Sequence, residues 1–184
     1  DLTGREDTPE GLICGGTMQV FVEPILPEPT VLLFGAGHIA FAVSKIAKMI
    51  GFRVVVIDDR PAYANKERFP GADEFHVDDP ATMVPQLNIN KSSYLVIACR
   101  GHLEDQRVLS EALKTKAIYI GMLGSKKKGK TVFANLKKEG ITQEALDGVH
   151  NPIGLPIAAE TPEEIAISIM AEIVKVWRDS NHDF

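Results

Sequence analysis

A glycine-rich turn is the first feature of the sequence that could bind a ligand. Gly35, Gly37 and Ala40 form the pattern G-x-G-x-x-A, which follows an apolar run at residues 31–34. The glycines allow a tight turn and a close approach of backbone to phosphate, and the small alanine lets a helix pack closely on the strand. A helix that begins at His38 would offer its free N–H groups to that anion. The pattern predicts nucleotide-type binding, although a turn that only packs helix on strand would have the same residues.

An acidic residue ends the next apolar run of the same unit. Asp58 follows residues 54–57, and Arg60 adds a cation two residues later. A carboxylate at this place can accept hydrogen bonds from a ribose diol and would repel a 2′-phosphate, so it favours an NAD-like over an NADP-like ligand. The alternative is that Asp58 only caps its loop.

A third group of reactive side chains follows the apolar run at residues 94–98. Arg100 could clamp a phosphate or a carboxylate, and His102 could act as an acid, a base or a ligand. Cys99 precedes them, and we interpret it as a small buried hydrophobe. Arg100 and His102 are therefore candidate cofactor-binding residues.

The lysine-rich stretch at residues 124–131 matches the P-loop pattern G-x-x-x-x-G-K-T. It follows about the fifth strand rather than the first, and no later strand ends in an Asp that could hold magnesium. Ser125 is suited to cap a helix that begins near Lys126, which would place the second half of the pattern inside that helix. We therefore expect Gly124, Ser125 and Lys126 to receive an anion at a basic helix N-terminus; a solvated lysine cluster is the alternative.

Two further segments carry residues that could do chemistry. Cys14 precedes two glycines, and its thiolate could bind a soft metal centre or carry sulfur; an incidental cysteine in a turn is the alternative. His150 begins a rigid H-N-P-I-G segment and either faces the site or caps its loop. The motifs of zinc and serine hydrolases are absent from the sequence.

The elements that must position these residues alternate between strand and helix. Strands are predicted at 17–25, 31–34, 54–57, 74–77, 94–98 and 117–120, and helices at 38–50, 80–87, 103–114, 126–139, 142–146 and from 162 onward. The last helix begins with a capping box at Thr161 and Glu164. This order predicts an α/β, Rossmann-like doubly wound fold, with a mostly parallel sheet and helices on both faces. Residues 1–30 are expected to form an N-terminal tail and short β segment, and residues 31–184 the Rossmann-like domain.

Composition narrows the function classes. The 184 residues carry a formal net charge of −5 and two cysteines, and we find no long apolar run. These values argue against nucleic-acid binding, a membrane span and a disulfide framework, and they predict a cytoplasmic protein. No signal peptide is visible, and because residue 1 is Asp, the sequence is expected to be a piece of something longer.

Several ordered motifs resemble one known family. They are C-G-G at 14–16, F-G-A-G-H at 34–38, V-I-D-D-R-P at 56–61, E-R-F-P at 67–70, R-G-H at 100–102, Y-I-G-M-L-G-S-K at 119–126, H-N-P-I-G-L at 150–155 and T-P-E-E-I-A-I-S-I-M-A-E-I at 161–173. The chain resembles the XdhC/CoxI family, the maturation factors of molybdenum hydroxylases such as xanthine dehydrogenase. The resemblance covers Leu12 to Val174 and implies that the C-terminal part is a Rossmann domain, preceded in full-length members by another domain.

The resemblance also implies a function. Family members bind molybdenum cofactor, as molybdopterin or its dinucleotide, protect it while a cysteine desulfurase adds sulfur, and help insert it into the hydroxylase apoenzyme. Cys14 is then the candidate contact to molybdenum or sulfur, and the protein is expected to be a non-catalytic accessory factor, with a homodimer also open. The alternatives are an NAD-dependent oxidoreductase that uses His38 or His102, and a sensor that binds NAD or FAD.

Overall fold

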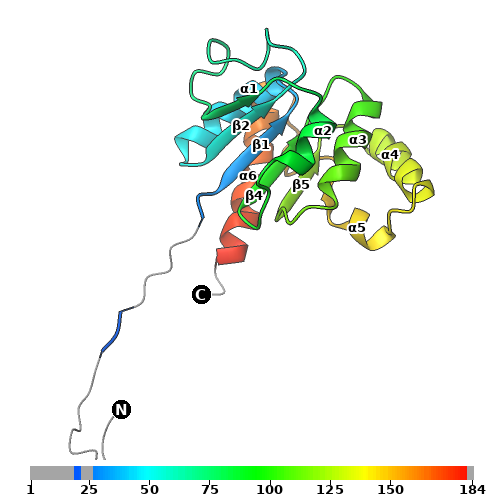
Figure 1. Cartoon of the computed structure of the whole chain (residues 1–184). Coiled ribbons are helices and arrows are strands. Elements are labelled where there is room, and N and C mark those ends of the chain that lie inside the picture. The colour runs from blue at the N-terminus through cyan, green and yellow to red at the C-terminus, as the bar shows by residue number, and fades with distance from the viewer. Residues whose placement is uncertain (1–18, 22–26, 182–184) are drawn as a thin grey trace, which may run out of the picture.

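The structure is a computed structural model that describes residues 19–21 and 27–181 (Figure 1). Its elements are β1 (Thr30–Phe34), α1 (His38–Met49), β2 (Arg53–Ile57), β3 (Glu74–His76), α2 (Pro80–Met83), the 3-10 turn η1 (Val84–Gln86), β4 (Ser93–Ile97), α3 (His102–Ala112), β5 (Tyr119–Met122), α4 (Lys126–Lys138), α5 (Gln143–Asp147), β6 (Val149–His150) and α6 (Pro162–Asn181). The strand predicted at 17–25 falls largely outside the described residues, and residues 19–21 form no strand.

The six strands of the described residues form one parallel sheet in the order β3-β2-β1-β4-β5-β6. This is the strand order of the doubly wound dinucleotide-binding fold, so the predicted fold class is confirmed. The strand order reverses between β1 and β4, which pair in register from Thr30 opposite Ser93 to Phe34 opposite Ile97. Ligands of such sheets bind outside the carboxyl ends of the strands at this switch point.

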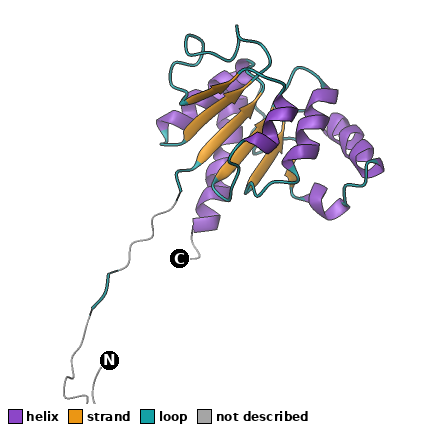
Figure 2. Cartoon of the chain, viewed as in Figure 1, coloured by secondary structure: helices purple, strands orange, loops and turns teal. Residues whose placement is uncertain are grey.

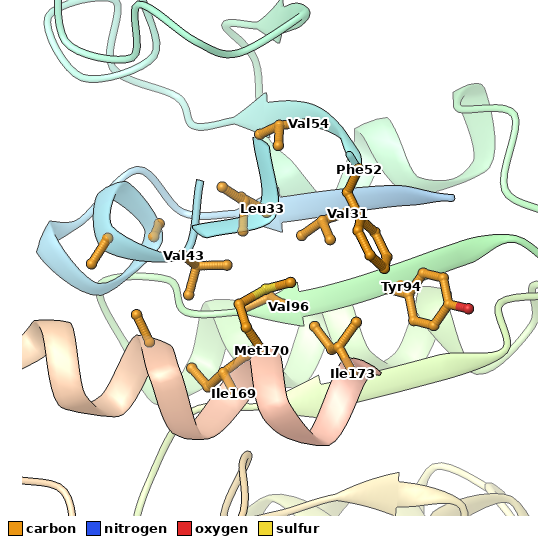
Figure 3. Packing of buried hydrophobic residues seen from close by; sticks show 14 of the residues in the cluster. Val31, Leu33, Val43, Phe52, Val54, Tyr94, Val96, Ile169, Met170 and Ile173 are labelled. Atoms are coloured by element: carbon orange, nitrogen blue, oxygen red, sulfur yellow. The ribbon is translucent and has the colours of Figure 1, made fainter. Parts of the chain in front are cut away.

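Helices cover both faces of the sheet (Figures 1 and 2). Alternate residues of each strand point to opposite faces, so Val31 and Leu33 of β1 face α1 and α6, while Leu32 and Phe34 face α2, α3 and α4. Figure 3 shows Ile169, Met170 and Ile173 of α6 packed beneath the strand residues. Because the strands are buried on both faces, they read in the sequence as continuous apolar runs.

The structure confirms the predicted cap of the last helix and differs from the predicted elements in two places. The Thr161 hydroxyl accepts a hydrogen bond from Glu164 N at 3.2 Å, and the Glu164 carboxylate accepts one from Thr161 N at 3.1 Å, which confirms the capping box. The helix predicted at 80–87 is divided into α2 and η1, because Pro85 lacks an N–H group to continue the helix. The two-residue strand β6 was not predicted.

Within the part of the chain that the structure describes, no helix is both long enough and apolar enough to cross a membrane.

Candidate functional site

The loops after β1 and β4 touch each other at the switch point. Gly35 has φ +103°, and a Cβ on it would lie 2.3 Å from the Ala98 carbonyl oxygen at the end of β4. Its N–H donates to the Ile57 carbonyl at 2.8 Å, which also ties the turn to β2. Glycine is therefore required here by both conformation and space.

The second glycine of the turn has the opposite environment. Gly37 is the N-cap of α1, and apart from its chain neighbours no heavy atom lies within 4 Å of the position that its Cβ would occupy. His38 beside it is exposed, whereas Ala40 is buried between α1 and the sheet. An anion can thus approach the N-terminus of α1 over Gly37, as the glycine pattern predicts.

Asp58 and Arg60, at the end of β2, are bound to each other. The Asp58 side chain is 4% exposed, and its two oxygens accept hydrogen bonds from Arg60 Nε at 2.7 Å and Arg60 Nη2 at 2.8 Å. Asp58 also accepts from Ala36 N, inside the glycine turn, at 2.8 Å. Burial alone would raise the pKa of Asp58, but these hydrogen bonds outweigh it and hold the pKa below its ordinary value. The pair therefore stabilises the glycine turn through the hydrogen bond from Ala36 N to Asp58.

A second ion pair joins the loops after β4 and β5. Asp105 on α3 is fully buried; it accepts from Cys99 N at 2.9 Å and forms an ion pair with the Lys128 ammonium of α4. Lys128 Nζ also donates to the Leu123 carbonyl at 2.9 Å. Burial raises the pKa of Asp105, and Lys128 offsets only part of that effect. This contact fixes the N-termini of α3 and α4 relative to each other.

Cys99 adjoins this ion pair, because its backbone N–H donates to Asp105. Burial and the nearby Asp105 carboxylate raise the pKa of its thiol, so it is not a reactive thiolate. Cys99 is only partly buried, and it packs against the core on the side of α2, α3 and α4.

A basic hollow of about 550 Å³ opens between the N-termini of α3 and α4. Its walls are formed by Arg100, Gly101, His102, Ser125, Lys127, Lys128, Thr131 and Val132. The structure thus brings together Arg100, His102 and Ser125, which were separate candidates in the sequence. Lys126 does not line the hollow, whereas Lys127 does. We name this region the α3–α4 hollow.

The cationic side chains around this hollow differ in the charged groups that lie near them. Arg100 Nη2 donates to the Asp59 carboxylate at 2.8 Å, so one wall is connected to the end of β2. Ser125 caps α4 by accepting from Lys128 N at 3.3 Å. The first turn of α4 contains no acidic residue, so its lysines lie against the positive end of the helix dipole. An anion in the hollow would relieve that repulsion.

The P-loop pattern is not a P-loop in this structure. Gly129, Lys130 and Thr131 lie inside α4, as their position after the Ser125 cap predicts. Gly129 packs against Asn151, whose Oδ1 would lie 1.7 Å from a Cβ at that position. Asn151 Nδ2 in turn donates to the Met122 carbonyl at the end of β5, at 2.9 Å. Gly129 is therefore a packing residue, and the Gly129–Asn151 contact holds α4 against β5.

His150 contacts α6 and does not line the hollow. Its ring stacks on Tyr119 with centroids 4.5 Å apart, and its Nδ1 lies 3.2 Å from the Glu172 carboxylate. Glu172 also accepts from the Tyr119 hydroxyl at 2.5 Å and from Gly154 N at 2.9 Å. Burial raises the pKa of Tyr119, and Glu172 raises it further. Of the two alternatives for His150, this contact supports anchoring of its own loop.

The predicted soft ligand, Cys14, lies outside the described residues. Residues 19–21 and 27–181 contain no group of three or more His, Cys, Asp or Glu side chains that could hold a metal ion. The assignment of Cys14 as a ligand therefore stays a prediction.

Comparison with known proteins identifies the domain. Residues 31–173 match the model of the XdhC Rossmann domain. The chain belongs to the XdhC family. It is 33% identical to the uncharacterized protein YqeB of Escherichia coli over 90% of this chain and 30% of that protein. It is also 33% identical to a probable xanthine dehydrogenase subunit of Bacillus subtilis, over 86% of this chain and 46% of that protein.

A solved structure gives the same result. A crystal structure named as a xanthine dehydrogenase from Bacillus halodurans has a TM-score of 0.74 and 35% identity, covering 83% of this chain and 44% of that chain. The XdhC-family chain thus spans less than half the length of each of these three relatives. The resemblance found in the sequence motifs is confirmed at the level of family and fold.

Proposed function

We propose that this domain binds molybdenum cofactor through its phosphate and serves as part of a maturation factor for a molybdenum hydroxylase such as xanthine dehydrogenase. The bound cofactor supplies the molybdenum centre at which the hydroxylase reaction takes place. The domain itself carries out no turnover in this proposal; it holds the cofactor for sulfuration by a cysteine desulfurase and for transfer to the apoenzyme. Family membership and the relatives named as xanthine dehydrogenase components support this role.

The observation that carries the proposal is the α3–α4 hollow. Molybdopterin ends in a phosphate, and the hollow is lined by the Lys127 side chain, the N-terminus of α4 and the Arg100 guanidinium, one nitrogen of which also donates to Asp59. Its volume of about 550 Å³ is in the range of small-molecule sites. The donor set therefore fits the phosphate end of the cofactor, with Arg100 and Lys127 as its direct partners. Lys128 lines the hollow but is paired with Asp105.

The molybdenum end needs a softer ligand than the described residues supply. Thiolate sulfur suits that requirement, and Cys14 is the residue that we assign to it. The two ends of the cofactor would then be held by different parts of the chain.

The test compares two lysines on the same helix. Lys127→Glu reverses a charge inside the hollow, and Lys130→Glu makes the same change on an exposed residue that does not line it. We expect Lys127→Glu to weaken the binding of freshly released molybdenum cofactor about tenfold, the value of one charge-assisted contact, and Lys130→Glu to have a much smaller effect. Ligand-dependent thermal shifts measure both affinities.

Cys14→Ser tests the other end of the cofactor. It is expected to leave the melting temperature of the free protein unchanged and to speed the loss of molybdenum from the complex, measured by metal analysis after gel filtration. Equal losses in the two lysine variants would contradict the assignment of the hollow, and unchanged retention in Cys14→Ser would contradict that of the thiolate.

A further inference from the structure

The end of β2 is where a dinucleotide-binding fold reads the ribose of its ligand, through an acidic side chain. In this domain the acidic side chain is present as Asp58, but its oxygens already have partners. Oδ1 accepts from Arg60 N at 3.0 Å and Arg60 Nε at 2.7 Å, while Oδ2 accepts from Ala36 N and Arg60 Nη2, both at 2.8 Å. Four donors thus occupy a carboxylate that has about four acceptor positions.

Arg60 is held in this place by two further contacts. Its guanidinium carbon lies 3.6 Å from the centroid of the Tyr63 ring, and its Nε lies 3.7 Å from an Asp59 oxygen. The Arg60 side chain is 25% exposed and the Asp58 side chain 4%, so Arg60 is the more solvent-accessible member of the pair. The guanidinium therefore occupies the approach that a ribose diol would need.

We infer that Arg60 closes the nucleoside-reading position of this domain, so that the domain selects phosphorylated ligands without recognising a ribose at the end of β2. A ribose diol offers two neutral hydroxyl donors, whereas Arg60 offers a bidentate, charge-assisted pair that is stronger. A ribose can reach Asp58 only by displacing that pair and its stacking on Tyr63. The backbone at Gly37 remains open, so the phosphate position and the nucleoside position of the fold are separated.

The closure leads to a gain-of-function experiment. Arg60→Ala exposes Asp58 and is expected to raise the affinity for ADP-ribose and for NAD about tenfold or more over the starting protein, measured by isothermal titration calorimetry. The double variant Asp58→Asn with Arg60→Ala is expected to lose that gain, because the exposed carboxylate is what would accept the diol. Inorganic pyrophosphate serves as a probe without ribose, and its affinity is expected to stay within about twofold in both variants, since neither Gly37 nor the α3–α4 hollow is changed.

A matched control uses Arg53, the first residue of β2, whereas Arg60 lies in the loop that follows this strand. Arg53 also pairs with an acidic residue, Glu74, but at the opposite end of β2. Arg53→Ala is expected to leave ADP-ribose binding unchanged. Tyr63→Ala loosens the guanidinium without removing it, and an intermediate gain is expected; this variant decides the question if Arg60→Ala does not fold.

A folded Arg60→Ala that binds ADP-ribose no more tightly than the starting protein does would overturn the inference. The inference goes beyond the proposed function and does not depend on it. Failure to bind molybdenum cofactor would overturn the proposed function and leave the closure of β2 intact, whereas tight NAD binding by the starting protein would overturn only the closure.

Discussion

Single residues at the switch point differ sharply in what they tolerate, although the sequence pattern treats them alike. Gly35 and Gly37 belong to one motif, yet only Gly35 has a positive φ and a neighbouring carbonyl at 2.3 Å from a Cβ. Gly37 has φ −75° and open space around it. Gly35 is thus required by the fold, whereas Gly37 leaves room for a ligand.

This difference predicts opposite outcomes for two substitutions. Gly35→Ala is expected to lower the free energy of unfolding by about 2 kcal/mol or more, because it adds a clash to an unfavourable φ. Gly37→Val is expected to keep the melting temperature and to weaken binding of phosphate-containing ligands, because its side chain fills the anion's approach. Urea unfolding and ligand-dependent thermal shifts separate the two effects, and unchanged affinity in Gly37→Val would argue against the glycine turn as a phosphate site.

The Asp58–Arg60 pair predicts a pH dependence of stability. The pKa of Asp58 in the folded state lies below its ordinary value of 3.8, so the folded state binds a proton less readily than the unfolded state. The contribution of Asp58 to stability is therefore complete above the ordinary pKa and is lost as the pH falls through the lower folded pKa. Asp58→Asn is expected to flatten the decline of melting temperature between about pH 5 and pH 2, and an unchanged slope would show that the pair contributes nothing.

At the scale of elements, the contact between Asp105 and Lys128 matters most. It joins the first turn of α3 to the first turn of α4 and so sets the width of the hollow between them. Asp105 is fully buried, while the Lys128 side chain is 27% exposed. Removing the lysine is expected to cost more stability than removing the aspartate, because it leaves an unpaired carboxylate in the interior.

Lys128→Met is expected to lower the free energy of unfolding by about 3 kcal/mol at pH 7, measured by urea unfolding. Burial already raises the pKa of Asp105, so protonation stabilises the folded state as the pH falls. The loss in Lys128→Met is therefore expected to shrink toward pH 4, because a neutral Asp105 needs no cation. Lys127→Met, an exposed neighbour, is the control and is expected to stay within about 0.5 kcal/mol of the starting protein. A loss that stays constant with pH would contradict the ion-pair explanation.

At the scale of the whole molecule, the layered architecture could be predicted from the sequence and the pairing of charges could not. Strands that are buried on both faces appear as apolar runs, and β1, β2 and β4 were predicted within one residue at each end for that reason. The caps at Ser125 and Thr161 could also be predicted from the sequence, because their hydrogen bonds join residues that are close in the chain. β6 is only two residues long and leaves no periodic signal.

The site residues stay predictions, but the structure places some of them together. The motifs identified Arg100, His102 and Ser125, which meet in one hollow because parallel strands end at one edge. Lys126, which the motifs also assigned, does not line the hollow, whereas Lys127 does, since a shift of one residue turns a helical side chain by about a quarter of a turn. Neither the binding of Asp58 by Arg60 nor that of Lys128 by Asp105 could be predicted from spacing, because each depends on where side chains lie after folding.

The contact between Gly129 and Asn151 has a consequence for recombination of domains in this family. The two residues come from separate segments, α4 and the loop after β6, yet the Asn151 amide fills the space that any side chain at position 129 would need. A chimaera with its crossover between them combines a helix from one parent with a loop from the other. If the first parent carries alanine at position 129, the two segments collide. Viable crossovers are therefore expected before α4 or after Asn151, with α4 through Asn151 inherited as one block.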